Sequence, residues 1–401
     1  MFEIINDGGI TSPKGFSAGA TYAGLKIDPE TLDLGILFSN LPAVAAATFT
    51  QNSVVSPSVT VSRKQLSNNL HRGIVVNSGC ANCSVGSQGM LDAEEMLSLA
   101  SSKLNVPSDD LFVASTGMIG VELPMALIRQ NMGNIKITPK GGKDFAKSMM
   151  TTDSHHKERA VSFMHDGETV VIGGAAKGVG MIHPNMATML CFIATDADVN
   201  KLFLQESLSD VVNDSFNMID VDGDQSTNDS VIMLANAASE TSQIDKNSAS
   251  AEAFKEALSY VCVELAKELV KDGEGAKTLV EVSVEGATSK EDARKSSRAI
   301  ASSLLVKAMV HGKDPNWGRI VMALGSTGIE LEENKIDVFI SNIHIVNQGV
   351  AIPYYKDAIV SAMGDREVHF KVNLNLGDHS AVAWGCDLTE DYVVFNSAYS
   401  T

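Results

Sequence analysis

One stretch of the sequence combines residue types that could carry out covalent chemistry. It runs from Lys177 to Leu190 as Lys-Gly-Val-Gly-Met-Ile-His-Pro-Asn-Met-Ala-Thr-Met-Leu, and Thr188 follows the small Ala187. A hydroxyl beside a strained peptide bond could attack the preceding carbonyl, and hydrolysis of the resulting ester would leave a new chain beginning with Thr188. Its α-amino group would have a pKa of about 7.7–8.0, suited to accept the proton of its own hydroxyl. On residue types alone, an ordinary threonine at the edge of a strand is the more common explanation.

Other candidate sites in the sequence are incomplete. Cys80 and Cys83 have the spacing of half a zinc site, but no second Cys/His pair follows at close spacing, which favours two reduced cysteines. Residues 220–229 are rich in oxygen ligands, but Gly223 stands at the fourth place, where a calcium loop of the EF-hand type needs glycine at the sixth. A polar turn whose side chains cap backbone groups is therefore preferred. A Ser-His-Asp triad stays open, because its members can be distant in the chain. We expect no metal.

Composition excludes several classes of protein. The chain has 401 residues, with 31 Lys+Arg against 49 Asp+Glu and a formal charge of −18. So acidic a chain would repel nucleic acid. The five cysteines are too few and odd in number for a secreted disulfide framework. No apolar run is long enough to cross a membrane, and the first residues lack the pattern of a signal peptide, so we expect a cytoplasmic protein.

Strand and helix patterns alternate along the chain and would position these residues. An apolar run at 189–194, directly after Thr188, predicts a strand. The other expected elements are strands at 73–76, 111–114 and 368–376, a loop at 77–87, and helices whose apolar stripes span 90–104, 204–215 and 254–269. Strands and helices in this mixed order favour layers of the α+β class.

Motifs along nearly the whole chain resemble one known family. The stretch 177–190 is similar to the self-cleavage motif of the ornithine acetyltransferases, which are glutamate N-acetyltransferases of arginine biosynthesis. Further blocks similar to the family, in family order, are Pro13–Phe16, Asn77–Gly79, Ser115–Gly120, Met150–Asp153, Asp222–Asp224, Lys271–Ala276, His311–Arg319 and Asn396 with Tyr399–Thr401. The resemblance reverses the interpretation of Thr188 as an ordinary threonine.

The resemblance implies a role for each matching residue. Thr188 would be the nucleophile and the first residue of a β chain, with Ala187 the last residue of the α chain. Thr116, through its hydroxyl, and Gly117, through its N–H, would form the oxyanion hole. The substrate-binding positions would be Thr151 or Thr152, Lys177, Thr188, Glu274, Asn396 and Thr401.

The implied reaction is acetyl transfer in two steps. Thr188 would take the acetyl group of N-acetylornithine, release ornithine, and pass the group to glutamate to give N-acetylglutamate. No cofactor is implied, although acetyl-CoA could be a second acetyl donor. A self-processed aminopeptidase or amidase of similar architecture is the alternative enzyme, and a non-catalytic metabolite-binding or scaffolding protein is the alternative outside enzymes.

The resemblance also implies an architecture. The fold would be α+β, a layered helix–sheet–sheet–helix sandwich of the self-processing ornithine acetyltransferase type. Residues 1–187 and 188–401 would be the two chains, the second divided near 280–290 into a nucleophile-bearing and a C-terminal lobe. Two α and two β chains would form a heterotetramer, without nucleic acid or membrane partners.

Overall fold

A computed structural model describes residues 1–183 and 189–398 of the chain. Its larger lobe is built on a nine-stranded sheet with the order β1-β6-β7-β8-β10-β3-β4-β5, in which β2 also pairs with β3. The strands are β1 (Phe2–Ile4), β2 (Phe16–Thr21), β3 (Leu34–Phe49), β4 (His71–Cys80), β5 (Leu111–Met118), β6 (Lys157–His165), β7 (Glu168–Lys177), β8 (Leu190–Thr195) and β10 (Ser230–Ala235).

The long strand β3 folds this sheet into two facing halves. Its second part pairs with β10, and its first part pairs with β2 and β4, with an irregular register between Phe38 and Ala43. Small and apolar side chains of both halves meet between them, among them Phe112 of β5 and Phe192 of β8, which are fully buried. The close packing of the two halves brings the ends of β5 and β7 near each other.

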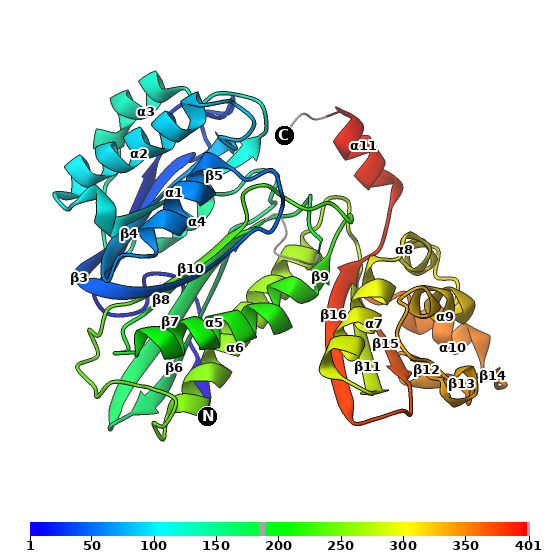
Figure 1. The fold of residues 1–401 in the computed structure, drawn as a ribbon. Helices are drawn as coiled ribbons and strands as arrows, with labels where there is room; N and C mark the ends of the chain where they lie inside the picture. The colour runs from blue at the N-terminus through cyan, green and yellow to red at the C-terminus, as the bar shows by residue number, and fades with distance from the viewer. Residues whose placement is uncertain (184–188, 399–401) are drawn as a thin grey trace.

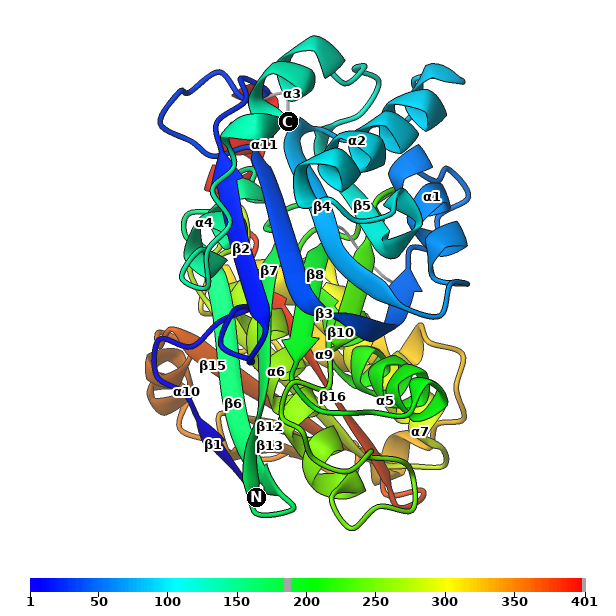
Figure 2. The ribbon, with the colours of Figure 1, turned by 90° about the vertical axis from the view of Figure 1, so that its left-hand side faces the viewer.

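Helices cover both outer faces of the folded sheet (Figure 1). One face carries α1 (Pro57–Gln65), α2 (Gln88–Leu104) and α3 (Met125–Asn131), and the other carries α5 (Lys201–Asp214) and α6 (Ala251–Lys271). The short helix α4 (Gly142–Ser148) packs beside β2 and β3. The predicted helix–sheet–sheet–helix arrangement of the α+β class is therefore confirmed, and Figure 2 shows the strands between these helical layers.

A second sheet forms the smaller lobe at the right of Figure 1. Its strand order is β14-β13-β12-β15-β11-β16-β9. The strands are β9 (Ile219–Asp220), β11 (Leu279–Ala287), β12 (Asp337–Ile340), β13 (Ile343–Asn347), β14 (Val350–Ala351), β15 (Glu367–Asn373) and β16 (His379–Cys386). The helices of this lobe are α7 (Lys290–Ser302), α8 (Leu304–His311), α9 (Trp317–Gly325) and α10 (Lys356–Ala362). The division of the chain at 187/188 and near 280–290 stays a prediction.

Helix α11 (Glu390–Ala398) leaves the smaller lobe and returns toward the larger one. None of its described residues is buried. Its polar contacts include those of Asp391 with Lys277, Tyr392 with Asp222 and Asn396 with Glu274.

The local predictions from periodicity largely agree with the structure. The helices predicted over 90–104 and 254–269 are α2 and α6, and the strand predicted at 189–194 is β8. The loop predicted at 77–87 was wrong at its start, because β4 continues to Cys80 in parallel pairing with β5. Polar and glycine residues in that stretch obscured the strand.

A buried histidine makes the stability of this fold sensitive to acid. His71 of β4 is fully buried, and its ring stacks on Phe112 with centroids 4.4 Å apart. Burial, followed by the charge of Lys201, lowers the pKa of His71 to about 4. In the unfolded chain the group would titrate near 6.5, so the unfolded state binds more protons between these pH values. The contribution of His71 to stability therefore falls as the pH drops from about 6.5 to about 4.

We expect His71→Leu to reduce this loss of stability in acid. About 2 kcal/mol of the pH dependence between pH 7 and pH 4.5 should disappear. Thermal unfolding of wild type and variant at several pH values measures this, with the exposed His379→Leu as the control. Parallel curves for wild type and His71→Leu would contradict the expectation.

Candidate active site

A polar pocket lies where the two lobes and α11 meet. It is lined by Thr116 and Gly117 of β5, Thr151 and Thr152, Lys177 of β7, Gly180, Met181, Asp222, Asp224, Glu274, Tyr392 and Asn396. All predicted site residues that the structure describes are therefore brought together here, from five separate parts of the chain. Ala187, Thr188 and Thr401 lie outside the described residues.

The ends of β5 and β7 are joined by one buried hydrogen bond. Lys177 Nζ donates to Thr116 Oγ1 at 3.0 Å, and both side chains are almost completely buried. Because the hydroxyl oxygen accepts this bond, its hydrogen is free to point toward another acceptor. That is the orientation that an oxyanion-hole donor needs.

Gly117 occupies a position that only glycine can fill. Its φ is +124°, and a Cβ on it would lie 2.4 Å from the carbonyl carbon of Gly79 on the neighbouring strand. A larger residue would have to push β4 and β5 apart. Glycine at 117 therefore lets β5 pack closely against β4 while Thr116 and Gly117 line the pocket.

Glu274 connects the two sides of the pocket. Thr152 Oγ1 donates to Glu274 Oε1 at 2.7 Å, and Asn396 Nδ2 of α11 donates to Glu274 Oε2 at 2.9 Å. Both threonines line the pocket, but only Thr152 makes this contact among the described residues. Gly180 packs against the same carboxylate, where a Cβ would lie 2.5 Å from Glu274 Oε2.

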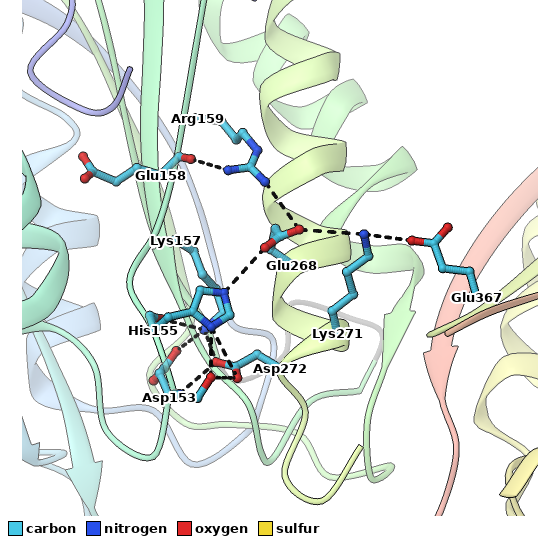
Figure 3. Close-up of polar contacts among 10 residues, drawn as sticks. Asp153, His155, Lys157, Glu158, Arg159, Glu268, Lys271, Asp272 and Glu367 are labelled. Atoms are coloured by element: carbon cyan, nitrogen blue, oxygen red, sulfur yellow. Dashed lines mark hydrogen bonds and ion pairs between the residues drawn. The ribbon is translucent and has the colours of Figure 1, made fainter. Parts of the chain in front are cut away.

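A buried ion-pair network supports the segment that carries Thr151 and Thr152 (Figure 3). Lys157 Nζ lies 2.8 Å from Asp153 Oδ1 and 2.6 Å from Asp272 Oδ2, and the side chains of Lys157 and Asp153 are fully buried. Asp153 also accepts the N–H groups of Thr151 at 3.0 Å and of Gly178 at 2.9 Å. Through Asp153, the network thus fixes the position of Gly178 relative to Thr151 and Thr152.

Burial and neighbouring charges shift the titration of these groups. Burial lowers the pKa of Lys177, and Asp153 opposes this effect. Burial acts to raise the pKa of Asp153, but the charges of Lys157 and Lys177, together with hydrogen bonds from Lys157 and Gly178, outweigh it and hold the pKa below its usual value. Burial raises the pKa of Asp222 to about 6, although Met181 N–H bonds to it.

Several residues of the site were not singled out as site residues from the sequence. Asp222 belongs to the segment interpreted as a polar turn, and its Oδ1 does accept from Asp224 N within that turn at 3.3 Å. Its carboxylate also accepts from the N–H groups of Met181 and Ile182, about 40 positions earlier. Tyr392 lines the pocket and donates to Asp222 Oδ2 at 3.3 Å, and no local sequence signal marks it.

The described residues contain no group of three or more His, Cys, Asp and Glu side chains arranged to hold a metal ion. Cys80 and Cys83 are both buried free cysteines. Burial raises the pKa of the Cys80 thiol, which makes it a poor ligand or nucleophile. Among the described helices, none is long and apolar enough to span a membrane.

Comparison with known proteins assigns the chain to a family. The ArgJ family model matches residues 17–401. The chain is 47% identical over 400 residues to the arginine biosynthesis bifunctional protein ArgJ of Dehalococcoides mccartyi, covering 100% of this chain and 99% of that protein. It is 42% identical over 400 residues to the protein of the same name from Oceanobacillus iheyensis, covering 100% of this chain and 98% of that protein.

A solved structure of a relative agrees with this assignment. The crystal structure of arginine biosynthesis bifunctional protein ArgJ from Bacillus halodurans matches with a TM-score of 0.51 and 38% identity, over 52% of this chain and 98% of that chain. This chain therefore belongs to the ArgJ family, and the resemblance seen in its motifs is confirmed.

We expect the Lys157 network to be needed for stability. Lys157→Met would leave Asp153 and Asp272 without their buried partner, at a cost of about 3–5 kcal/mol. Lys290→Met, which breaks an exposed ion pair with Asp214, is the control and should cost at most about 1 kcal/mol. Denaturant unfolding of both variants measures the difference. Equal effects of the two changes would contradict the role assigned to Lys157.

Proposed function

We propose that this chain cleaves itself between Ala187 and Thr188 and then transfers an acetyl group from N-acetylornithine to glutamate. An acetyl ester on Thr188 is the intermediate, and ornithine and N-acetylglutamate are the products. The observation that carries the proposal is the pocket in which Lys177 orients the Thr116 hydroxyl at 3.0 Å, at the start of the segment that leads to Thr188. The names of the relatives, which place them in arginine biosynthesis, support the choice of substrates.

The lengths of the relatives support self-cleavage. The curated relatives are matched end to end by this chain. The solved chain from Bacillus halodurans is matched over 98% of its length by 52% of this chain, so it is about half as long. A cut between residues 187 and 188 would give chains of 187 and 214 residues, each about half of the 401.

The charges of the pocket suit amino-acid substrates. Asp222, Asp224 and Glu274 would attract the ammonium group of N-acetylornithine, and Lys177 would attract a substrate carboxylate. The acetyl carbonyl would then lie near Thr116 and Gly117, which would donate to its oxygen as negative charge develops.

The acetyl group would be transferred in two half-reactions. The Thr188 hydroxyl oxygen attacks the acetyl carbonyl, its proton passes to the α-amino group of Thr188, and that proton leaves on the ornithine nitrogen as the amide bond breaks. The glutamate amine then attacks the ester carbonyl and gives a proton to the α-amino group of Thr188. The N–C bond of N-acetylglutamate forms, the ester C–O bond breaks, and that proton passes to the Thr188 oxygen. Water has to be kept from the ester, because hydrolysis would waste the acetyl group.

This chemistry uses no cofactor. Acetyl-CoA is a possible second acetyl donor in the proposal, and the word "bifunctional" in the names of the relatives favours it. We further propose that two α and two β chains assemble as a heterotetramer in the cytoplasm. An aminopeptidase or amidase would differ in one respect: water, and not glutamate, would accept the acyl group.

Self-cleavage should be visible on a denaturing gel. Wild type should give two bands of about 20 and 23 kDa, in proportion to 187 and 214 of 401 residues in 42.5 kDa, and Thr188→Ala should stay intact. Glutamate should also accelerate ornithine release from N-acetylornithine by the processed wild type. An intact wild-type chain that is active would refute the proposed nucleophile, and glutamate-independent release would favour the amidase.

The Thr116 hydroxyl should contribute to the rate of acetyl transfer. Thr116→Ala removes one oxyanion donor, so we expect kcat to fall by about 10²–10³. Thr116→Ser keeps the hydroxyl and should retain most of the activity. Steady-state kinetics of the processed variants measure both values. A kcat for Thr116→Ala equal to that of wild type would move the oxyanion hole elsewhere.

A further inference from the structure

Residues 220–230 bond to the chain on both sides of the proposed cleavage site. This stretch, here named the clamp, contacts Met181 and Ile182 before the site and Met189 after it. We propose that the clamp positions the Ala187–Thr188 bond for self-cleavage, with Asp222 and Asp229 as its positioning residues. This inference rests on the self-cleavage proposed above.

The upstream side is held through both backbone groups of one residue. Ile182 N donates to Asp222 Oδ1 at 2.8 Å, and Ile182 O accepts from Val221 N at 2.8 Å. Met181 N donates to the other carboxylate oxygen, Asp222 Oδ2, at 2.6 Å. Asp222 therefore uses both of its oxygens to hold two consecutive residues.

The downstream side is held in the same manner. Met189 N donates to Asp229 Oδ1 at 2.8 Å, and Met189 O accepts from Ser230 N at 3.2 Å. Asp229 is only 1% exposed, so water does not compete for this bond. The residue that directly follows Thr188 is thus fixed at both of its backbone groups.

The clamp is anchored in the smaller lobe. Asp220 Oδ1 lies 2.9 Å from His183 Nδ1, and Asp220 Oδ2 lies 2.9 Å from the buried Lys307 Nζ of α8. Lys307 also donates to the carbonyl of Cys386 at the end of β16, at 3.2 Å. Asp220 is the last residue of β9, which pairs with β16, so the start of the clamp is tied to the second sheet.

Holding the backbone on both sides of the cleavage site would favour self-cleavage by lowering its entropic cost. The hydroxyl of Thr188 has to approach the carbonyl carbon of Ala187, and prior alignment of reacting groups removes much of the entropic cost of that approach. Asp222 and Asp229 both follow the cleavage site in sequence, while Met181 and Ile182 precede it. The upstream contacts would therefore join the two product chains after the cut.

The two aspartates differ in a way that can be tested. Asp229 offers one oxygen to the downstream backbone, and asparagine can replace that acceptor. Asp222 needs two acceptor oxygens, and asparagine has only one. Asp229→Asn should therefore cleave at a rate close to that of wild type, whereas Asp229→Ala, Asp222→Ala and Asp222→Asn should cleave about 10- to 100-fold more slowly.

The experiment follows cleavage of the full chain after a pulse of cell-free synthesis with labelled methionine. Denaturing gels give the rate at which the full-length band becomes two fragments, and Asp210→Asn on α5 is a control that removes an exposed charge outside the clamp. Rescue by asparagine at 229 but not at 222 distinguishes positioning from a general loss of folding.

The outcomes separate the two proposals. Wild-type rates in Asp222→Ala and Asp229→Ala would overturn the clamp while leaving self-cleavage in place. Equal slowing by Asp229→Asn and Asp229→Ala would also overturn it, because the acceptor geometry would then be irrelevant. A wild-type chain that never divides would contradict self-cleavage itself.

Discussion

The site depends on a buried lysine at the end of β7. Lys177 is only 3% exposed, and its hydrogen bond to Thr116 joins β7 to β5 across the fold of the larger sheet. A buried ammonium group is costly unless it has partners. Asp153 is the principal charge that opposes the effect of burial on Lys177, and it is held in turn by Lys157. Removing any member of this series would therefore disturb Thr116, the proposed oxyanion donor, as well as the local packing.

The pocket is lined by residues from segments that are distant in sequence. Thr152 precedes β6 and Asn396 belongs to α11, yet both bond to the carboxylate of Glu274, which follows α6. Since α11 has no buried residues, its position depends largely on such polar contacts, including that between Tyr392 and Asp222. The two lobes share one apolar core, in which α6 packs against β9, β11 and β16, and the hydrogen bonds of the pocket lie in addition to that core.

The sequence predicted the amphipathic elements well and the polar contacts poorly. Helices α2 and α6 and strand β8 follow from apolar periodicity, because burial of one face is a local property of the chain. The polar turn at 220–229 was predicted, and Asp222 caps Asp224 N within it, but no local pattern identifies its further partners about 40 residues away. Asp153 and Lys157 are four residues apart, yet their third partner, Asp272, comes 115 positions after Lys157. The grouping of Thr116, Lys177, Glu274 and Asn396 followed from the family resemblance and not from spacing.

In the proposed reaction, Thr188 is exposed as an N-terminal residue and carries the acetyl group. Intact mass spectrometry of the purified protein after incubation with N-acetylornithine, without glutamate, tests this most directly. The account predicts one added acetyl group on the chain that begins Thr-Met-Leu, and its loss when glutamate is supplied. A processed and active enzyme in which that chain never gains an acetyl group, or gains it at another residue, would contradict the account.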